Sequence, residues 1–169
     1  MSDLERDRRI PLDMTVNGRP VSLRVEPPDL LLDVLRDQLG LTGAKRSCDV
    51  QVCGACTVLL GGLPVSACSV LAYEARGREV LTIEGLADGD QLHPVQVAFL
   101  AESAFQCGYC TPGMIMATRA LLEESPDASR EEIKEYLRGN ICRCTGYVSI
   151  LHAVAEAQRA MARSPGPTA

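Results

Sequence analysis

Eight cysteines fall into two groups of four, and their spacing suits the binding of iron–sulfur clusters. The first cysteine group has the pattern C-x4-C-x2-C…C, made by Cys48, Cys53, Cys56 and Cys68. This is the plant-type ferredoxin spacing for a [2Fe-2S] cluster. Three thiolates from one loop require a tight turn, and the small Gly54 lets backbone N–H groups approach the sulfur atoms. Such N–H···S contacts offset the negative charge of a cluster.

Two other uses of the first cysteine group are less favoured. Structural zinc sites usually combine two short C-x2–4-C pairs, whereas here one loop offers three ligands. Disulfides need an oxidising compartment, and the sequence shows no secretion signal. The spacing therefore favours an iron–sulfur cluster over both alternatives.

The second cysteine group combines C-x2-C with C-x-C, made by Cys107, Cys110, Cys142 and Cys144. Each pair is followed by a helix-start signal, Thr111-Pro112 in one case and Thr145-Gly146 in the other. The N-terminus of a helix favours an anion, which a thiolate-ligated cluster is. The same setting would lower thiol pKa values in a dithiol redox enzyme, so the spacing alone leaves that alternative and a zinc site open.

The elements that must position the first cysteine group are mainly strands. Alternating apolar residues, the Asn17-Gly18 turn signal and Pro27-Pro28 predict a hairpin followed by a break. The full prediction is strand 12–16, strand 21–25, helix 30–39, hairpin 57–60 with 63–65, and strand 80–83. The three cysteines nearest the N-terminus lie in the irregular stretch between the helix and the second hairpin.

Helical periodicity replaces this alternation in the second half. His93-Pro94 opens one expected helix, Thr111-Pro112 opens another that ends near Glu124, and Ser129 with Glu132 forms a capping box for a third. A fourth helix is expected over 145–162. The predicted division is a frayed N-terminus 1–10, a first domain 11–84, a linker 85–90, a helical domain 91–163 and a disordered tail 164–169.

Composition and charge exclude some classes of function. The net charge of −5 argues against a nucleic-acid partner, because phosphate binding requires a basic surface. No apolar run is long enough to span a membrane. Arg8-Arg9 could begin a twin-arginine signal, but the residues that follow are polar and interrupted by Pro11. We therefore expect a cytoplasmic protein.

Three stretches of the chain resemble the iron–sulfur subunit of the xanthine oxidase family of molybdenum hydroxylases. They are Cys48-Asp-Val-Gln-Val-Cys53-Gly-Ala-Cys56-Thr, Gln106-Cys107-Gly-Tyr-Cys110-Thr-Pro-Gly113 and Gly139-Asn-Ile-Cys142-Arg-Cys144-Thr-Gly-Tyr147. They occur in the family's order, contain seven of the eight cysteines, and the similarity runs from about residue 12 to 162. One departure is Gln51, where the family often has glycine.

The resemblance implies an α+β protein with an N-terminal ferredoxin-like β-grasp domain and a C-terminal four-helix bundle. It implies two [2Fe-2S] clusters. The inner cluster, on the second cysteine group, would lie nearest a molybdopterin held by a large subunit, with Gln106 and the backbone at Cys144 in contact with the pterin. The outer cluster, on the first cysteine group, would lie toward FAD in a medium subunit. The implied assembly is a dimer of heterotrimers.

By this resemblance the chain is the non-catalytic electron-transfer subunit of a molybdenum-dependent oxidoreductase. Electrons would pass from molybdenum through the inner and outer clusters to FAD. The competing hypothesis is a free-standing two-cluster ferredoxin, which would have no obligate partner.

Overall fold

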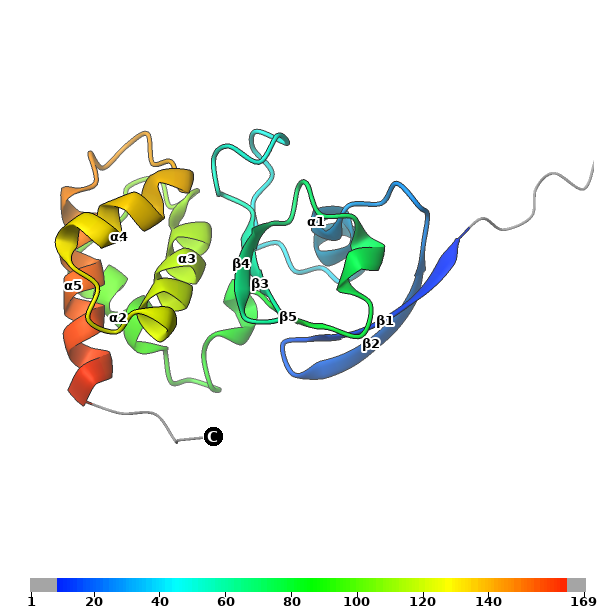
Figure 1. Cartoon of the computed structure of the whole chain (residues 1–169), viewed down its shortest axis with the longest axis horizontal. Coiled ribbons are helices and arrows are strands. Elements are labelled where there is room, and N and C mark those ends of the chain that lie inside the picture. The colour runs from blue at the N-terminus through cyan, green and yellow to red at the C-terminus, as the bar shows by residue number, and fades with distance from the viewer. Residues whose placement is uncertain (1–8, 164–169) are drawn as a thin grey trace, which may run out of the picture.

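The computed structural model describes residues 9–163, in which a sheet and a group of helices lie side by side (Figure 1). The predicted α+β class is confirmed. Predictions for a frayed N-terminus and a disordered tail fall largely on residues 1–8 and 164–169, outside the described part. Within residues 9–163, no helix is long and apolar enough to cross a membrane.

The first half forms one five-stranded sheet with the order β2-β1-β5-β3-β4. Its strands are β1 (Ile10–Val16), β2 (Arg19–Val25), β3 (Thr57–Leu60), β4 (Leu63–Ser66) and β5 (Glu79–Leu81). The two hairpins are antiparallel, and β5 joins them by pairing parallel to β1 and antiparallel to β3. Asn17 and Gly18 both have positive φ, as a tight hairpin turn requires.

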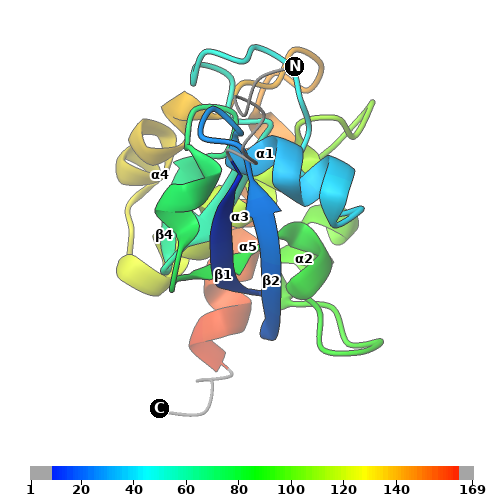
Figure 2. The ribbon, with the colours of Figure 1, turned by 90° about the vertical axis from the view of Figure 1, so that its right-hand side faces the viewer.

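One helical segment packs on this sheet. It begins as α1 (Leu31–Asp33) and continues as a π-helical turn over Val34–Gln38, where the apolar pattern predicts a helix. Leu31 and Leu35 are fully buried with Leu12 of β1. The β1–β2 hairpin lies at the end of the molecule farthest from the helices of the second half, which stand behind it in Figure 2.

The second half contains α2 (Pro94–Ala101), α3 (Thr111–Glu124), α4 (Arg130–Tyr136) and α5 (Val148–Arg163). The predicted start signals of α2 and α4 are confirmed, because capping hydrogen bonds are present at both helix N-termini. The His93 ring accepts a hydrogen bond from the Val95 N–H, and Ser129 and Glu132 close a reciprocal capping box. The short 3-10 turn Leu137–Gly139 follows α4 and leads into the C-x-C pair.

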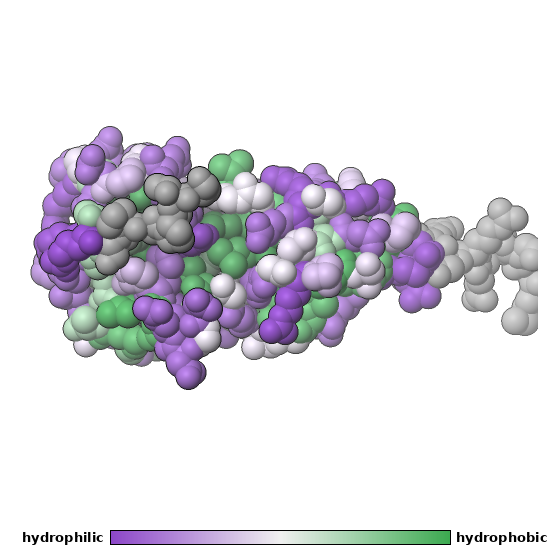
Figure 3. All heavy atoms as spheres, turned by 90° about the horizontal axis from the view of Figure 1, so that it is seen from below, coloured by the Kyte–Doolittle hydropathy of each residue, from purple (hydrophilic) through white to green (hydrophobic). Residues whose placement is uncertain are grey.

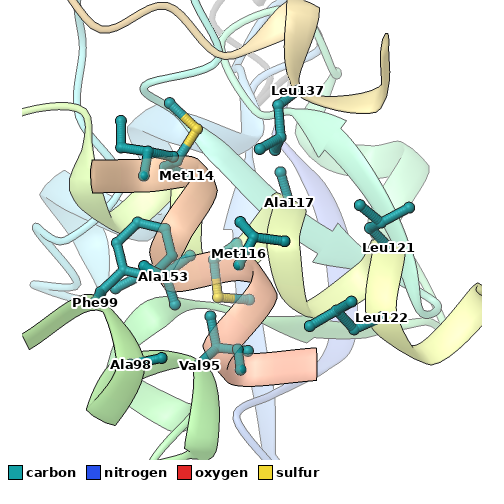
Figure 4. Packing of buried hydrophobic residues seen from close by; sticks show 14 of the residues in the cluster. Val95, Ala98, Phe99, Met114, Met116, Ala117, Leu121, Leu122, Leu137 and Ala153 are labelled. Carbon is teal, nitrogen blue, oxygen red and sulfur yellow. The ribbon is translucent and has the colours of Figure 1, made fainter. Parts of the chain in front are cut away.

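α3 is the central helix of the second half, and it touches both parts of the molecule. Met114 and Met116 are fully buried in one apolar cluster with Phe99 of α2 (Figure 4). Ile150 of α5 belongs to the same cluster. Leu59 of β3 belongs to the same apolar cluster. The sheet and the helices are therefore joined by shared core packing. Apolar side chains also reach the surface in patches over the helices and along their border with the sheet (Figure 3).

The predicted start of the last helix is wrong by three residues. α5 begins at Val148, whereas the sequence predicts a start at Thr145. Gly146 and Tyr147 have φ values of 64° and 67°, and this left-handed conformation cannot continue a right-handed helix. The C-x-C pair therefore lies in a loop, and its expected placement at a helix N-terminus is not observed.

Candidate metal centres

The first cysteine group gathers around the loop that precedes β3. Backbone N–H groups of Val52 and Cys53 each approach the sulfur of Cys48 to 3.4 Å. After the β3–β4 hairpin, the Ala67 N–H donates to the carbonyl of Cys56 at 3.3 Å, which brings Cys68 back beside the loop. The structure thus reproduces the two features expected of this group, inward-facing amides and a fourth cysteine returning from the hairpin.

The pKa values of two thiols in this group are shifted in opposite directions by their surroundings. Hydrogen bonds from the backbone of Val50, Val52 and Cys53 lower the pKa of the Cys48 thiol to about 6. Burial, with the nearby Cys68, raises the pKa of the Cys56 thiol to about 12. A bound cation would be needed to hold Cys56 as a thiolate at neutral pH, as coordinating metals do.

Gln51, in the same loop, has φ of 58°, a left-handed conformation that glycine adopts more readily than other residues. The left-handed conformation costs a non-glycine residue roughly 1–2 kcal/mol. Glycine's greater freedom in the unfolded chain costs about 0.5–1 kcal/mol. Gln51→Gly should therefore raise the free energy of unfolding by up to about 1.5 kcal/mol, measured by denaturant unfolding of the cluster-loaded chain.

The matched control for this prediction is Gln91→Gly. Gln91 is also exposed but does not have positive φ, so glycine there should only destabilise the chain. Equal effects of the two substitutions would show that the backbone at Gln51 carries no strain.

All four cysteines of the second group line one cavity of about 190 Å³. The sulfur atoms of Cys144 and Cys107 are 3.6 Å apart, and both residues are exposed. Cys110 is the N-cap residue of α3, one residue before the predicted N-cap Thr111, and burial raises the pKa of the Cys110 thiol to about 12. The predicted convergence of two distant cysteine pairs is therefore observed.

Thr145 has a role that the sequence does not suggest. Its hydroxyl donates a hydrogen bond to the sulfur of Cys142 at 3.1 Å, and the Cys142 N–H donates to the Tyr147 hydroxyl at 2.9 Å. Burial raises the pKa of the Cys142 thiol, but hydrogen bonds from the Thr145 hydroxyl and from nearby backbone N–H groups outweigh it and lower the pKa overall. Such donors stabilise a thiolate ligand and tune a cluster.

The loops of the two cysteine groups touch each other. The Ile141 N–H donates to the carbonyl of Cys53 at 2.8 Å, and the Tyr109 hydroxyl donates to the carbonyl of Arg46. Cys53 even forms part of the wall of the cavity that holds the second group. Two centres bound at these sites would be close neighbours.

Gln106 is exposed and precedes the exposed Cys107. Large apolar side chains are also exposed near this opening, namely Phe105, Tyr109 and Ile141. The structure thus places Gln106 and Cys144 where another molecule could reach them. Contact of Gln106 and the Cys144 backbone with a pterin stays a prediction.

The chemistry of the donors fits iron–sulfur clusters. All eight cysteines are free, each group supplies four sulfur donors, and N–H and O–H donors approach some of the sulfur atoms. Within residues 9–163, no three His, Cys, Asp or Glu side chains are grouped so that they could hold a single metal ion. A [2Fe-2S] cluster does not need three ligands around one ion, because its four cysteines are shared between two irons.

Two family models match consecutive parts of the chain. A 2Fe-2S iron–sulfur cluster binding domain matches residues 14–82, and a [2Fe-2S] binding domain matches residues 82–155. Each matched segment contains one complete cysteine group. The zinc and dithiol alternatives are therefore not supported, and two [2Fe-2S]-binding domains are present.

Two relatives that are named as enzyme subunits are similar to the chain over most of its length. The chain is 47% identical over 146 residues to a probable xanthine dehydrogenase subunit of Bacillus subtilis, covering 86% of this chain and 84% of that protein. It is 46% identical over 149 residues to the nicotine 6-hydroxylase small subunit of Paenarthrobacter nicotinovorans, covering 88% and 90%.

A solved structure shows the same likeness in three dimensions. A chain of quinoline 2-oxidoreductase from Pseudomonas putida 86 superposes with a TM-score of 0.90 at 42% identity, covering 96% of this chain and 100% of that one. Together with the two cluster-binding matches and the relatives that are subunits, this confirms the resemblance seen in the sequence. The chain belongs to the iron–sulfur subunits of the xanthine oxidase family of molybdenum hydroxylases, which are the non-catalytic subunits of these oxidoreductases.

Proposed function

We propose that this chain carries electrons between the partner subunits of a molybdenum hydroxylase. Each cluster, when bound, would supply a one-electron redox centre. The outer cluster would be held by Cys48, Cys53, Cys56 and Cys68, and the inner cluster by Cys107, Cys110, Cys142 and Cys144. The electrons would come from a molybdopterin site in a large subunit and leave to FAD in a medium subunit.

The observation that carries this proposal is the contact between the two cysteine groups combined with their unequal exposure. The Ile141 N–H reaches the Cys53 carbonyl, so the groups are adjacent. Cys107 and Cys144 are open to the surface, where a partner's redox group could approach, whereas Cys56 and Cys68 are buried. Gln106, exposed at the same opening, is the side chain we assign to contact the pterin, together with the Cys144 backbone.

We further assign residues 11–84 to a ferredoxin-like β-grasp domain, 85–90 to a linker and 91–163 to a four-helix bundle. The mixed five-stranded sheet with one packed helix and the four helices of the second half support this division. A dimer of heterotrimers in the cytoplasm is the assembly we propose.

A free-standing ferredoxin is the less favoured function. Relatives of matching length are named as subunits, among them the small subunit of nicotine 6-hydroxylase. The chain also exposes Phe105, Tyr109 and Ile141 near the second cysteine group. Neighbouring exposed apolar side chains are typical of an interaction surface.

The test begins with anaerobic reconstitution of the chain with iron and sulfide. The expected product is brown, contains iron and no zinc, and gives two electron paramagnetic resonance (EPR) signals on reduction. The chain should then elute with the co-expressed large and medium subunits in size-exclusion chromatography. Zinc in place of iron, or a chain that stays monomeric beside both partners, would contradict the proposal.

A further inference from the structure

Asn140 places a buried side-chain amide at the junction of the two cysteine groups. Only 7% of the residue is exposed. Its Nδ2 lies 3.1 Å from the carbonyl oxygen of Gly54, 3.2 Å from the hydroxyl of Thr57 and 3.2 Å from the carbonyl oxygen of Gly113. Two of these three neighbours can only accept, so the amide must face them with its N–H donors.

Each group in this network belongs to a segment that bears cysteines. Gly54 lies in the tight turn of the first cysteine group. Gly113 lies in the first turn of α3, three residues after Cys110. Asn140 itself stands two residues before Cys142. One amide therefore joins the outer-cluster loop to both ligand-bearing segments of the inner cluster.

The backbone around this junction is so closely packed that neither Gly54 nor Gly113 has room for a side chain. A β-carbon added at Gly54 would overlap the Gly139 carbonyl and the Asn140 amide. One added at Gly113 would overlap the Gly54 carbonyl. The Thr57 hydroxyl, which accepts from Asn140, also donates to the Gly54 carbonyl at 2.8 Å. The amide is thus the shared donor of a closely fitted contact.

We propose that Asn140 is a positioning residue that fixes the separation and orientation of the two clusters, an inference that rests on the proposed function. Electron transfer between two centres falls steeply as they move apart. A side chain that holds the two loops in one arrangement therefore sets the rate of electron transfer between the clusters through the backbone that it binds.

The test uses Asn140→Asp in the reconstituted, fully reduced chain. Aspartate has the same shape but replaces the donor by a second acceptor, so it should repel the Gly54 and Gly113 carbonyls. Pulsed EPR measures the magnetic interaction between the two reduced clusters. We expect the variant to lose the single, well-defined interaction of the parent chain while both individual cluster signals remain.

Gln158→Ala is the matched control. The Gln158 amide also donates to two backbone carbonyls, those of Pro126 at 2.8 Å and Ala128 at 3.0 Å, but all of these residues lie in the helical half. Its loss should leave the interaction between the clusters unchanged. A parent chain that lacks either cluster signal would contradict the proposed function, which is a separate outcome from failure of this inference.

If Asn140→Asp does not fold, Asn140→Ala tests the inference in its place, because the alanine variant removes the donor without adding a charge. An unchanged magnetic interaction in the variant that folds would overturn the inference. Loss of the inner cluster from Asn140→Ala, with both clusters retained in Gln158→Ala, would also overturn it, because Asn140 would then serve cluster assembly and not cluster placement.

Discussion

Cys110→Ser in the assembled hydroxylase should stop electrons from the substrate reaching the outer cluster. Cys110 is assigned as a ligand of the inner cluster and stands at the N-cap of α3. Serine replaces a soft thiolate by a hard oxygen ligand, which suits a cluster iron poorly. Because the inner cluster is proposed as the first acceptor, its damage should also abolish flavin reduction, whatever the state of the outer cluster.

Cys53→Ser should give the complementary result, because Cys53 is assigned to the outer cluster. Substrate should still reduce the inner cluster, while flavin reduction stops. Anaerobic rapid mixing with substrate, followed by freeze-quench EPR and flavin absorbance, separates the two patterns. Direct chemical reduction by dithionite is the control for the cluster that each variant retains. Normal flavin reduction in both variants would show that the proposed order of electron transfer is wrong.

The local features of this fold could be predicted because each depends on residues close together in sequence. Asn17-Gly18 supplies the left-handed turn of the first hairpin, and Ser129 with Glu132 caps α4. The first cysteine group is largely of this kind, since three of its members come from one loop. Its spacing alone therefore indicates the correct class of metal centre.

The start of α5 shows where local signals fail. Thr145 and Gly146 look like a helix opening, yet the Thr145 hydroxyl turns to the Cys142 sulfur and Tyr147 takes a left-handed conformation. The same hydroxyl also accepts a hydrogen bond from the Tyr147 N–H at 3.2 Å, so Thr145 closes a local turn of the kind that Ser and Thr form outside helices. The pattern could not tell the two uses apart.

The junction between the cysteine groups could not be predicted from the sequence either. Asn140 and Gly54 are 86 residues apart, and nothing in the pattern around either residue indicates the other. The patterns around Gly54 and Gly113 indicate only a tight turn and a helix start, respectively. The structure shows a second requirement for glycine at both positions, because a β-carbon at Gly113 would overlap the Gly54 carbonyl and one at Gly54 would overlap the Gly139 carbonyl and the Asn140 amide.

Gly54→Ala should be among the most destabilising single substitutions in this chain. Gly54 has φ of 67°, which costs a residue with a β-carbon roughly 1–2 kcal/mol. The new methyl group would also overlap the Gly139 carbonyl and the Asn140 amide, and overpacking of this kind typically costs about 1–3 kcal/mol. Alanine's lower entropy in the unfolded chain offsets roughly 0.5–1 kcal/mol of these costs, so the net loss in the free energy of unfolding should be about 1–4.5 kcal/mol, measured by denaturant unfolding of the reconstituted chain.

Gly18→Ala isolates the part of this loss that comes from the junction. Gly18 has a similar φ of 73°, but an added β-carbon there would meet nothing within 4 Å. It should therefore show only the backbone cost of roughly 1–2 kcal/mol less the roughly 0.5–1 kcal/mol gained from alanine's lower entropy in the unfolded chain, a net loss of about 0–1.5 kcal/mol, with the EPR spectrum of both clusters unchanged. The difference between the two variants measures how tightly the two loops are held together. Equal losses would mean that the loops can separate without cost, and the close contact between the cysteine groups would then not be maintained by packing at Gly54.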